Sequence, residues 1–303
     1  MSTDFDTLNR KFGCGGQVAF KAGPGGLAVA EVSNAHGTAV IALQGAHVMT
    51  WAPWNEAPVI WLSKAAKFTP GKSIRGGAPV CWPWFGPHAE NPKLPGHGFA
   101  RTVMWDVTGA EALADGATRL SFRIRQDDAT RAQWPHASEV MNIVTVGRTL
   151  ELELVTRNTG AGAITIGDAY HTYFEVSDIR NCRIDGLDGC PYLDKADGGR
   201  KKQQAGPVTI DSEVDRIYLE STADIVIDDP GLKRRIRVAK RGSRSSVVWN
   251  PWVDKAAKMG DFGADGYLNM VCVESSNAAD DVVSIPPGGE HRLWVRYGVE
   301  PRG

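Results

Sequence analysis

The chain has 303 residues, of which 42% are hydrophobic and 23% charged, so its composition is that of a folded globular protein and excludes a disordered one. Its 34 glycines and 17 prolines predict many turns. The formal net charge is −1, which gives the molecule no overall field to attract DNA, RNA or an acidic membrane. A small-molecule partner is therefore expected, with no nucleic acid and no membrane, and the chain itself is expected to be a monomer or a weak homo-oligomer.

The cysteines and the N-terminus predict a cytoplasmic protein with reduced thiols. The five cysteines are odd in number, widely spaced and without a CxxC pair, so neither a disulfide framework nor a zinc knuckle is indicated. The N-terminal stretch contains Asp4 and Asp6 and lacks the apolar run of a secretion signal. Residues 32–55 contain no Asp, Glu, Lys or Arg, but glycines and Pro53 interrupt them, so they predict two buried strands rather than a membrane helix.

Short apolar runs predict strands along the whole chain. Alternating or clustered apolar residues, bounded by Gly, Asn, Asp or Pro, occur at 27–32, 38–43, 119–126, 149–160, 223–228, 234–241, 245–250, 267–274 and 291–300. Helical periodicity is hard to find, and only 255–263 suggests one short turn of helix. No linker, repeat or composition shift divides the chain. We therefore expect an all-β fold, an antiparallel sandwich or barrel, formed by residues 1–303 as a single domain.

The basic stretch KRRIRVAKR, at 233–241, alternates charge with Ile236 and Val238. This alternation is typical of a solvated edge strand or an outer strand, where charge also prevents edge-to-edge pairing. We therefore interpret it as a strand and not as a nucleic-acid site.

Three segments place a polar side chain among aromatic or apolar neighbours: GHGFAR at 96–101, YHTYF at 170–174 and VCVESSN at 271–277. A solvated loop is the alternative for His97, a hydrogen-bonded core position for His171, and simple exposure for Glu274. A glutamate and a histidine together in an aromatic pocket can act as a general base and a general acid. The sequence thus indicates a site that moves protons.

Metal binding and nucleophilic catalysis are the rival interpretations. Two histidines and a glutamate are a possible ligand set, but no HxH, HxxxH or HExxH spacing preorganises them. No GxSxG elbow occurs, and no cysteine lies beside a histidine in the sequence. We therefore predict no metal and no cofactor.

Six segments, in this order, resemble the hexose-6-phosphate mutarotase branch of the aldose 1-epimerase family: SIRGGAPVCWPWFG from 73, LPGHGFAR from 94, YHTYF from 170, EVDRIY from 213, WNPWVDKAAKMGDF from 249 and VCVES from 271. The resemblance spans about residues 40–300. It implies a single galactose-mutarotase-like β-sandwich. It also implies an isomerase that interconverts the α and β anomers of a hexose 6-phosphate such as glucose 6-phosphate.

The resemblance also implies roles for individual residues. The catalytic histidine and glutamate of the family fall on His171 and Glu274. Its sugar-binding positions fall on Arg75, His97 and Asp215. Arg101, in the segment GFAR, is the other arginine expected near the phosphate.

The chain departs from the family at two places. Many relatives read CFPQFG where this chain has Trp82 and Trp84, and many have proline where it has Ser275. The tryptophans remove a polar contact, and either could stack on the apolar face of a sugar. Substrate identity is therefore more open than reaction type, and the alternatives are a free-aldose mutarotase and a non-catalytic sugar-phosphate binder. A glycoside hydrolase or lyase would need a second catalytic carboxylate, for which Asp215 is the candidate.

Overall fold

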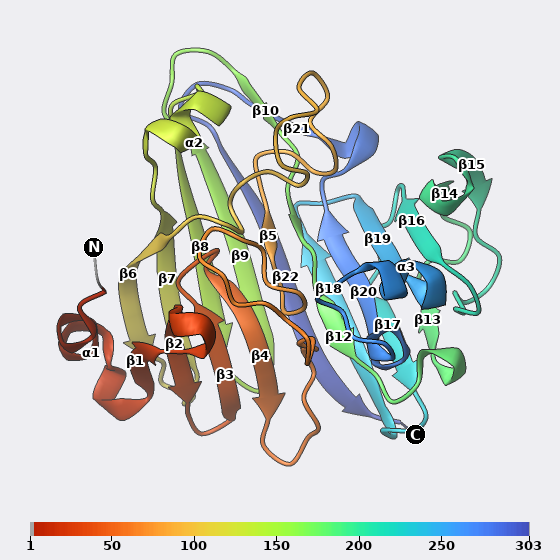
Figure 1. The fold of residues 1–303 in the computed structure, drawn as a ribbon, viewed down its shortest axis with the longest axis horizontal. Coiled ribbons are helices and arrows are strands. Elements are labelled where there is room, and N and C mark those ends of the chain that lie inside the picture. Colours follow the sequence, from red (N-terminus) through yellow and green to blue (C-terminus); the bar gives the residue numbers. More distant parts are fainter. Residues whose placement is uncertain (1–2, 303) are drawn as a thin grey trace.

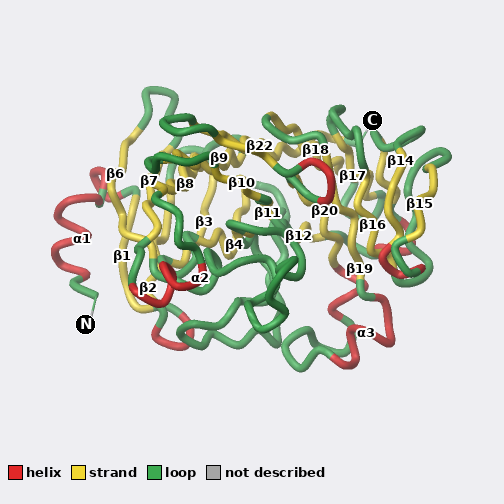
Figure 2. The backbone as a smooth tube through the Cα atoms, turned by 90° about the horizontal axis from the view of Figure 1, so that it is seen from above, coloured by secondary structure: helices red, strands yellow, loops and turns green. Residues whose placement is uncertain are grey.

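Two eight-stranded antiparallel sheets pack face to face, and two smaller sheets accompany them (Figure 1). The computed structural model describes residues 3–302. We call the two large sheets the front sheet and the back sheet. Seen from above, the back sheet forms a curved layer on one side, and the long loops and α3 (Trp252–Lys258) gather on the opposite side of the front sheet (Figure 2).

The front sheet has the strand order β15-β14-β16-β19-β20-β11-β5, and β12 pairs with β20 beside β11. Its strands are β15 (Arg200–Gln203), β14 (Pro191–Asp194), β16 (Val214–Tyr218), β19 (Ser245–Asn250), β20 (Met270–Ser276), β11 (Ala169–Tyr170), β5 (Val80–Cys81) and β12 (Tyr173–Glu175).

The back sheet has the order β13-β17-β18-β22-β9-β8-β7-β6. Its strands are β13 (Arg183–Asp185), β17 (Ile225–Asp229), β18 (Arg234–Arg241), β22 (Glu290–Pro301), β9 (Leu150–Asn158), β8 (Ser138–Val146), β7 (Thr118–Ile124) and β6 (Trp105–Ala112).

The two smaller sheets and the helices complete the fold. A four-stranded sheet has the order β1 (Val18–Ala22), β2 (Ala28–Ser33), β3 (Gly37–Ala42) and β4 (His47–Pro53), and a two-stranded sheet joins β10 (Ile164–Ile166) to β21 (Val283–Ile285). The other two α-helices are α1 (Phe5–Phe12) and α2 (Asp128–Gln133). Short 3₁₀ turns occupy Cys14–Gly16, Pro24–Gly26, Ile179–Asn181, Lys195–Asp197, Gly266–Asn269 and Ala279–Asp281.

The core lies between the sheets because each strand turns alternate side chains inward. In β8, for example, Val140, Val144 and Val146 are fully buried. Asn142 is buried with them and is satisfied there, since it donates to the Ala46 carbonyl at 3.0 Å and accepts from the Tyr170 hydroxyl at 2.7 Å. The largest apolar cluster draws on residues from 18 to 297, so the N-terminal strands and both large sheets share one core.

Most sequence-based predictions of the fold are confirmed. The architecture is all-β and antiparallel, and β3 and β4 are the two buried strands predicted within 32–55. The expected short helix is α3, which begins three residues before the predicted segment. All five cysteines are free thiols. Among the described residues, no helix is both long enough and apolar enough to cross a membrane.

The basic segment forms a strand, β18, as predicted. Of the two positions expected for it, edge or outer, the edge is excluded, because β17 pairs with one side of it and β22 with the other. Its first arginine, Arg234, is buried and donates to the carbonyls of Ala57, Pro58 and Glu175. Helix α1 was not expected, although the Asp4 side chain caps it by accepting from a backbone N–H of its first turn.

Candidate active site

A cavity of about 550 Å³ opens on the face of the front sheet that points away from the back sheet. Strand alternation explains its position. In β20, Val271 and Val273 enter the core, so Glu274 points to the other face and lines the cavity. In β16, Val214 enters the core and Asp215 lines the cavity in the same way. The volume suits a small-molecule ligand.

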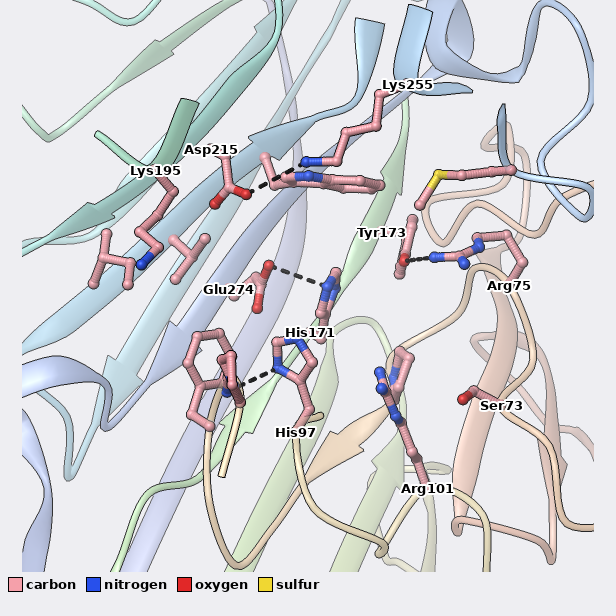
Figure 3. A pocket seen from close by; sticks show the side chains of 18 of the residues that line it. Ser73, Arg75, His97, Arg101, His171, Tyr173, Lys195, Asp215, Lys255 and Glu274 are labelled. Atoms are coloured by element: carbon pink, nitrogen blue, oxygen red, sulfur yellow. Dashed lines mark hydrogen bonds and ion pairs between the residues drawn. The ribbon is translucent and has the colours of Figure 1, made fainter. Parts of the chain in front are cut away.

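His171 and Glu274 face each other at the buried floor of this cavity (Figure 3). His171 lies between β11 and β12, and Glu274 lies in the neighbouring strand β20. The imidazole Nε2 is 3.4 Å from the carboxylate Oε1, and the two side chains are 12% and 2% exposed. A histidine and a carboxylate at this separation can exchange protons with one bound molecule.

Burial opposes charge on both members of the pair. Burial lowers the pKa of His171 well below its usual range, and the positive charges of Arg101 and Arg75 lower it further. Burial raises the pKa of Glu274 well above its usual range, and the nearby Asp215 carboxylate raises it further. The two shifts have opposite directions, so burial disfavours both the imidazolium and the carboxylate, and it favours a pair that holds a single proton.

His97 stands at the cavity edge with its ring oriented by the backbone of Gly86. The ring Nδ1 accepts from the Gly86 N–H at 3.3 Å, and the backbone N–H of His97 donates to the Gly86 carbonyl at 2.7 Å. Burial lowers the pKa of His97 to about 3, so the ring is neutral. With Nδ1 as an acceptor, the proton lies on Nε2, and His97 offers a hydrogen-bond donor to a ligand.

Arg75 is held on the cavity wall by two side chains. Its Nε donates to the Asp261 carboxylate at 3.1 Å, and its Nη1 donates to the Tyr173 hydroxyl at 3.0 Å. The two glycines that follow it have φ values of +103° and +75°. A Cβ on Gly77 would collide with the buried ring of His47, so the segment needs glycine to bring Arg75 to the cavity.

Arg101 is the second arginine of the cavity wall, and it lies near His97 and His171 (Figure 3). Its Nη2 donates to the Gly96 carbonyl at 2.9 Å. Within residues 3–302 it forms no ion pair, so its positive charge is available to an anionic group of a ligand.

The opposite side of the cavity carries Asp215, Lys255 and Lys195 (Figure 3). The Lys255 ammonium is 2.7 Å from the Glu213 carboxylate and 3.7 Å from that of Asp215. Burial raises the pKa of Asp215, and Lys255 partly offsets this effect. The Asp215 carboxylate can accept hydrogen bonds from hydroxyl groups of a ligand, and the ammonium groups of Lys255 and Lys195 can donate to them.

The predicted sugar-stacking tryptophans do not line the cavity, so that prediction is corrected. Trp82 is fully buried, where its ring packs edge-on against Phe99 and Trp134. Trp84 is also outside the cavity, and its indole N–H donates to the Pro95 carbonyl at 2.9 Å. The aromatic surface of the cavity comes instead from Phe85, Tyr173 and Trp249.

The other six predicted site residues all line the cavity: Arg75, His97, Arg101, His171, Asp215 and Glu274. Sequence reasoning missed Tyr173, Asp261 and Lys255. Tyr173 follows His171 by two residues on an extended segment, which would have placed both on one face. Its ring stacks on the imidazole at a centroid distance of 5.0 Å. Asp261 and Lys255 lie in the segment WNPWVDKAAKMGDF, which carried part of the family resemblance.

A metal ion would find one group of potential ligands among the described residues: His171, Cys272 and Glu274. Their ligand atoms lie within 4.8 Å of one another. Cys272 is fully buried beside His171 and Glu274.

Comparisons with known proteins agree with this architecture. The model of the aldose 1-epimerase family matches residues 29–298. An Escherichia coli K12 protein named "Putative glucose-6-phosphate 1-epimerase" is 39% identical over 80% of this chain and 80% of its own length. A protein of the same name from Cenchrus ciliaris is 36% identical over 87% of this chain and 82% of its own length. A crystal structure of "a putative mutarotase (YeaD) from Salmonella typhimurium" superposes with a TM-score of 0.88, with 35% identity and 95% of both chains covered.

Proposed function

The chain belongs to the aldose 1-epimerase family, and on this premise we propose that it is an isomerase that interconverts the α and β anomers of a hexose 6-phosphate, in the first place glucose 6-phosphate. One observation carries the proposal. His171 and Glu274 lie 3.4 Å apart at the buried floor of a cavity whose wall bears Arg75 and Arg101. His171 and Glu274 supply an acid and a base, and the two arginines can bind a phosphate.

The reaction opens the sugar ring and closes it again. Glu274 takes the proton of the anomeric hydroxyl while His171 gives one to the ring oxygen, so the bond between C1 and the ring oxygen breaks and an open aldehyde forms. Rotation about the C1–C2 bond presents the other face of the carbonyl. Closure with the two residues in reversed roles gives the other anomer. Each proton returns to its starting group, and the mechanism therefore needs no cofactor.

The arginines link substrate charge to the acid–base pair. The positive charges of Arg75 and Arg101 help to lower the pKa of His171 in the empty cavity. A bound phosphate dianion would neutralise those charges and favour protonated His171, which is the acid that ring opening requires. A free hexose has no such group. The same arrangement thus supports a preference for phosphorylated substrates.

The remaining cavity residues suit the hydroxyl groups of the sugar. His97 offers an N–H donor, and Asp215 offers a carboxylate acceptor. The Trp249 and Tyr173 rings provide apolar surface for the C–H face of the sugar. In this function the reacting C1 lies over the catalytic pair and C6 points toward the arginines.

The function is tested by measuring α to β interconversion with magnetisation-exchange NMR on the purified protein, for glucose 6-phosphate, glucose and galactose. We expect strong acceleration for glucose 6-phosphate and much weaker acceleration for the two free sugars. Acceleration of the free sugars alone would contradict the phosphate preference and favour a free-aldose mutarotase. No acceleration of any substrate would contradict the enzymatic function and favour a sugar-phosphate binder.

A further inference from the structure

Strand pairing brings together His171 and Glu274, which line the cavity, and Cys272, which is fully buried beside them. Cys272 and Glu274 are two residues apart on β20 and therefore share one face. Tyr173 of β12 pairs with Cys272, which brings His171 beside them from the neighbouring strand. The ligand atoms of the three side chains lie within 4.8 Å of one another. Such a cluster on paired strands is rigid and needs little rearrangement to close around an ion.

Unused ligand atoms in this cluster point to a second role. Glu274 Oε2 and His171 Nδ1 are buried and accept or donate no hydrogen bond within the described part of the chain. The Glu274 side chain is only 2% exposed and faces His171 (Figure 3). A buried carboxylate oxygen without a partner is costly, and a bound cation would satisfy it. The proposed ring opening has no use for the Cys272 thiol.

We propose that His171, Cys272 and Glu274 form an inhibitory site for a thiophilic divalent cation, zinc above all. The inference rests on the proposed function for the effect of the ion on turnover, because the ion would occupy the acid–base pair. Imidazole nitrogen, thiolate sulfur and carboxylate oxygen are the ligands of zinc, with water as the fourth. Zinc ligands must be unprotonated, so zinc binding releases two protons to solvent: the one on the Cys272 thiol and the one that the His171–Glu274 pair holds.

Charge and ligand type set the expected strength and selectivity. The Cys272 thiolate and the Glu274 carboxylate together balance the two charges of the ion. The arginines of the cavity wall, Arg75 and Arg101, oppose a cation, so we expect half-inhibition at about micromolar free zinc rather than the tighter binding of a structural zinc site. Magnesium prefers oxygen ligands in an octahedral arrangement and should not inhibit at the same concentration.

The experiment titrates chelator-buffered zinc into the purified enzyme and follows glucose 6-phosphate interconversion. We expect inhibition that competes with the sugar, is reversed by chelator and is not reproduced by magnesium. Cys272→Ser should retain activity and lose zinc sensitivity by at least about 10-fold. Cys182→Ser is the matched control, because Cys182 is also buried but lies outside the cluster, and it should keep the wild-type sensitivity.

Cobalt binding gives a readout that does not depend on turnover. Cobalt bound through a thiolate should show a charge-transfer absorption band in the wild type and in Cys182→Ser, and no such band in Cys272→Ser. Equal zinc sensitivity of Cys272→Ser and wild type would overturn the proposal, and Cys272→Ala repeats the comparison if the serine variant folds poorly. A cobalt band in a protein without mutarotase activity would support the site and contradict the proposed function. An active enzyme with neither a cobalt band nor zinc inhibition would contradict the zinc site and support the proposed function.

Discussion

The Tyr173 side chain contacts both Arg75, the proposed phosphate ligand, and His171 of the proposed catalytic pair, and removal of its hydroxyl gives a sharp prediction. Tyr173→Phe deletes the acceptor that holds Arg75 Nη1 at 3.0 Å, and it keeps the ring that stacks on His171. A hydrogen bond from a charged donor is worth about 1.5–3 kcal/mol when it is fully expressed. Arg75 is 25% exposed and keeps its bond to Asp261. We therefore expect a loss of about 1 kcal/mol, or about five-fold in kcat/KM.

The assay is the interconversion rate of glucose 6-phosphate and of glucose, measured for Tyr173→Phe, Arg75→Ala and the double variant. The five-fold loss should occur with the phosphate and not with free glucose. In the Arg75→Ala background, Tyr173→Phe should cause no further loss, because the bond that it breaks is already absent. An equal loss with both substrates, or the same loss in both backgrounds, would refute the idea that Tyr173 acts through Arg75.

Three further predictions concern pH and stability. The active form of the His171–Glu274 pair holds one proton, and activity should fall at low pH when the pair takes up a second one, on His171. Because burial lowers the pKa of His171, this acid limb of the kcat/KM profile should lie below pH 6.5; an acid limb above that value would contradict the assignment. Burial raises the pKa of Asp168 to about 8. Between about pH 4 and 8 the folded state therefore keeps a proton on Asp168 that the unfolded state has released, so the free energy of unfolding falls as the pH rises through this range. Asp168→Asn should therefore raise the urea midpoint more at pH 8 than at pH 5, and an equal change at both would count against this explanation. Gly98→Ala should destabilise by at least about 2 kcal/mol in urea unfolding, because a Cβ there meets the Trp82 carbonyl and φ is +68°; a neutral change would be unexpected.

The fold could be predicted because alternation of apolar side chains is a local signal. The order of strands is not local, which explains why the sequence left two positions open for the basic strand β18. Its alternating pattern marks one buried and one solvated face, and both an edge strand and an outer central strand have this pattern. Only the pairing with β22, about sixty residues later in the chain, shows that β18 lies inside the sheet and not at its edge. The buried Arg234 likewise depends on carbonyl groups that a distant loop and strand β12 bring to it.

That His171 and Glu274 lie in one site could be predicted because both residues lie in short segments that resemble the family. The side chains of Trp82 and Trp84 could not be placed from sequence, because in an irregular loop no period tells which face a residue takes. The partners of Arg75 were missed for a different reason. Asp261 is 186 residues away along the chain, and only the packing of the loop after α3 brings it within 3.1 Å of the guanidinium.

The rate of α to β interconversion of glucose 6-phosphate in the Glu274→Gln and His171→Asn variants tests the central claim most directly. If the two residues are the base and the acid, each variant should lose at least about 100-fold in kcat. The double variant should lose little more than either single variant, because the two groups act as a unit. A Glu274→Gln enzyme that turns over glucose 6-phosphate at the wild-type rate would contradict the account.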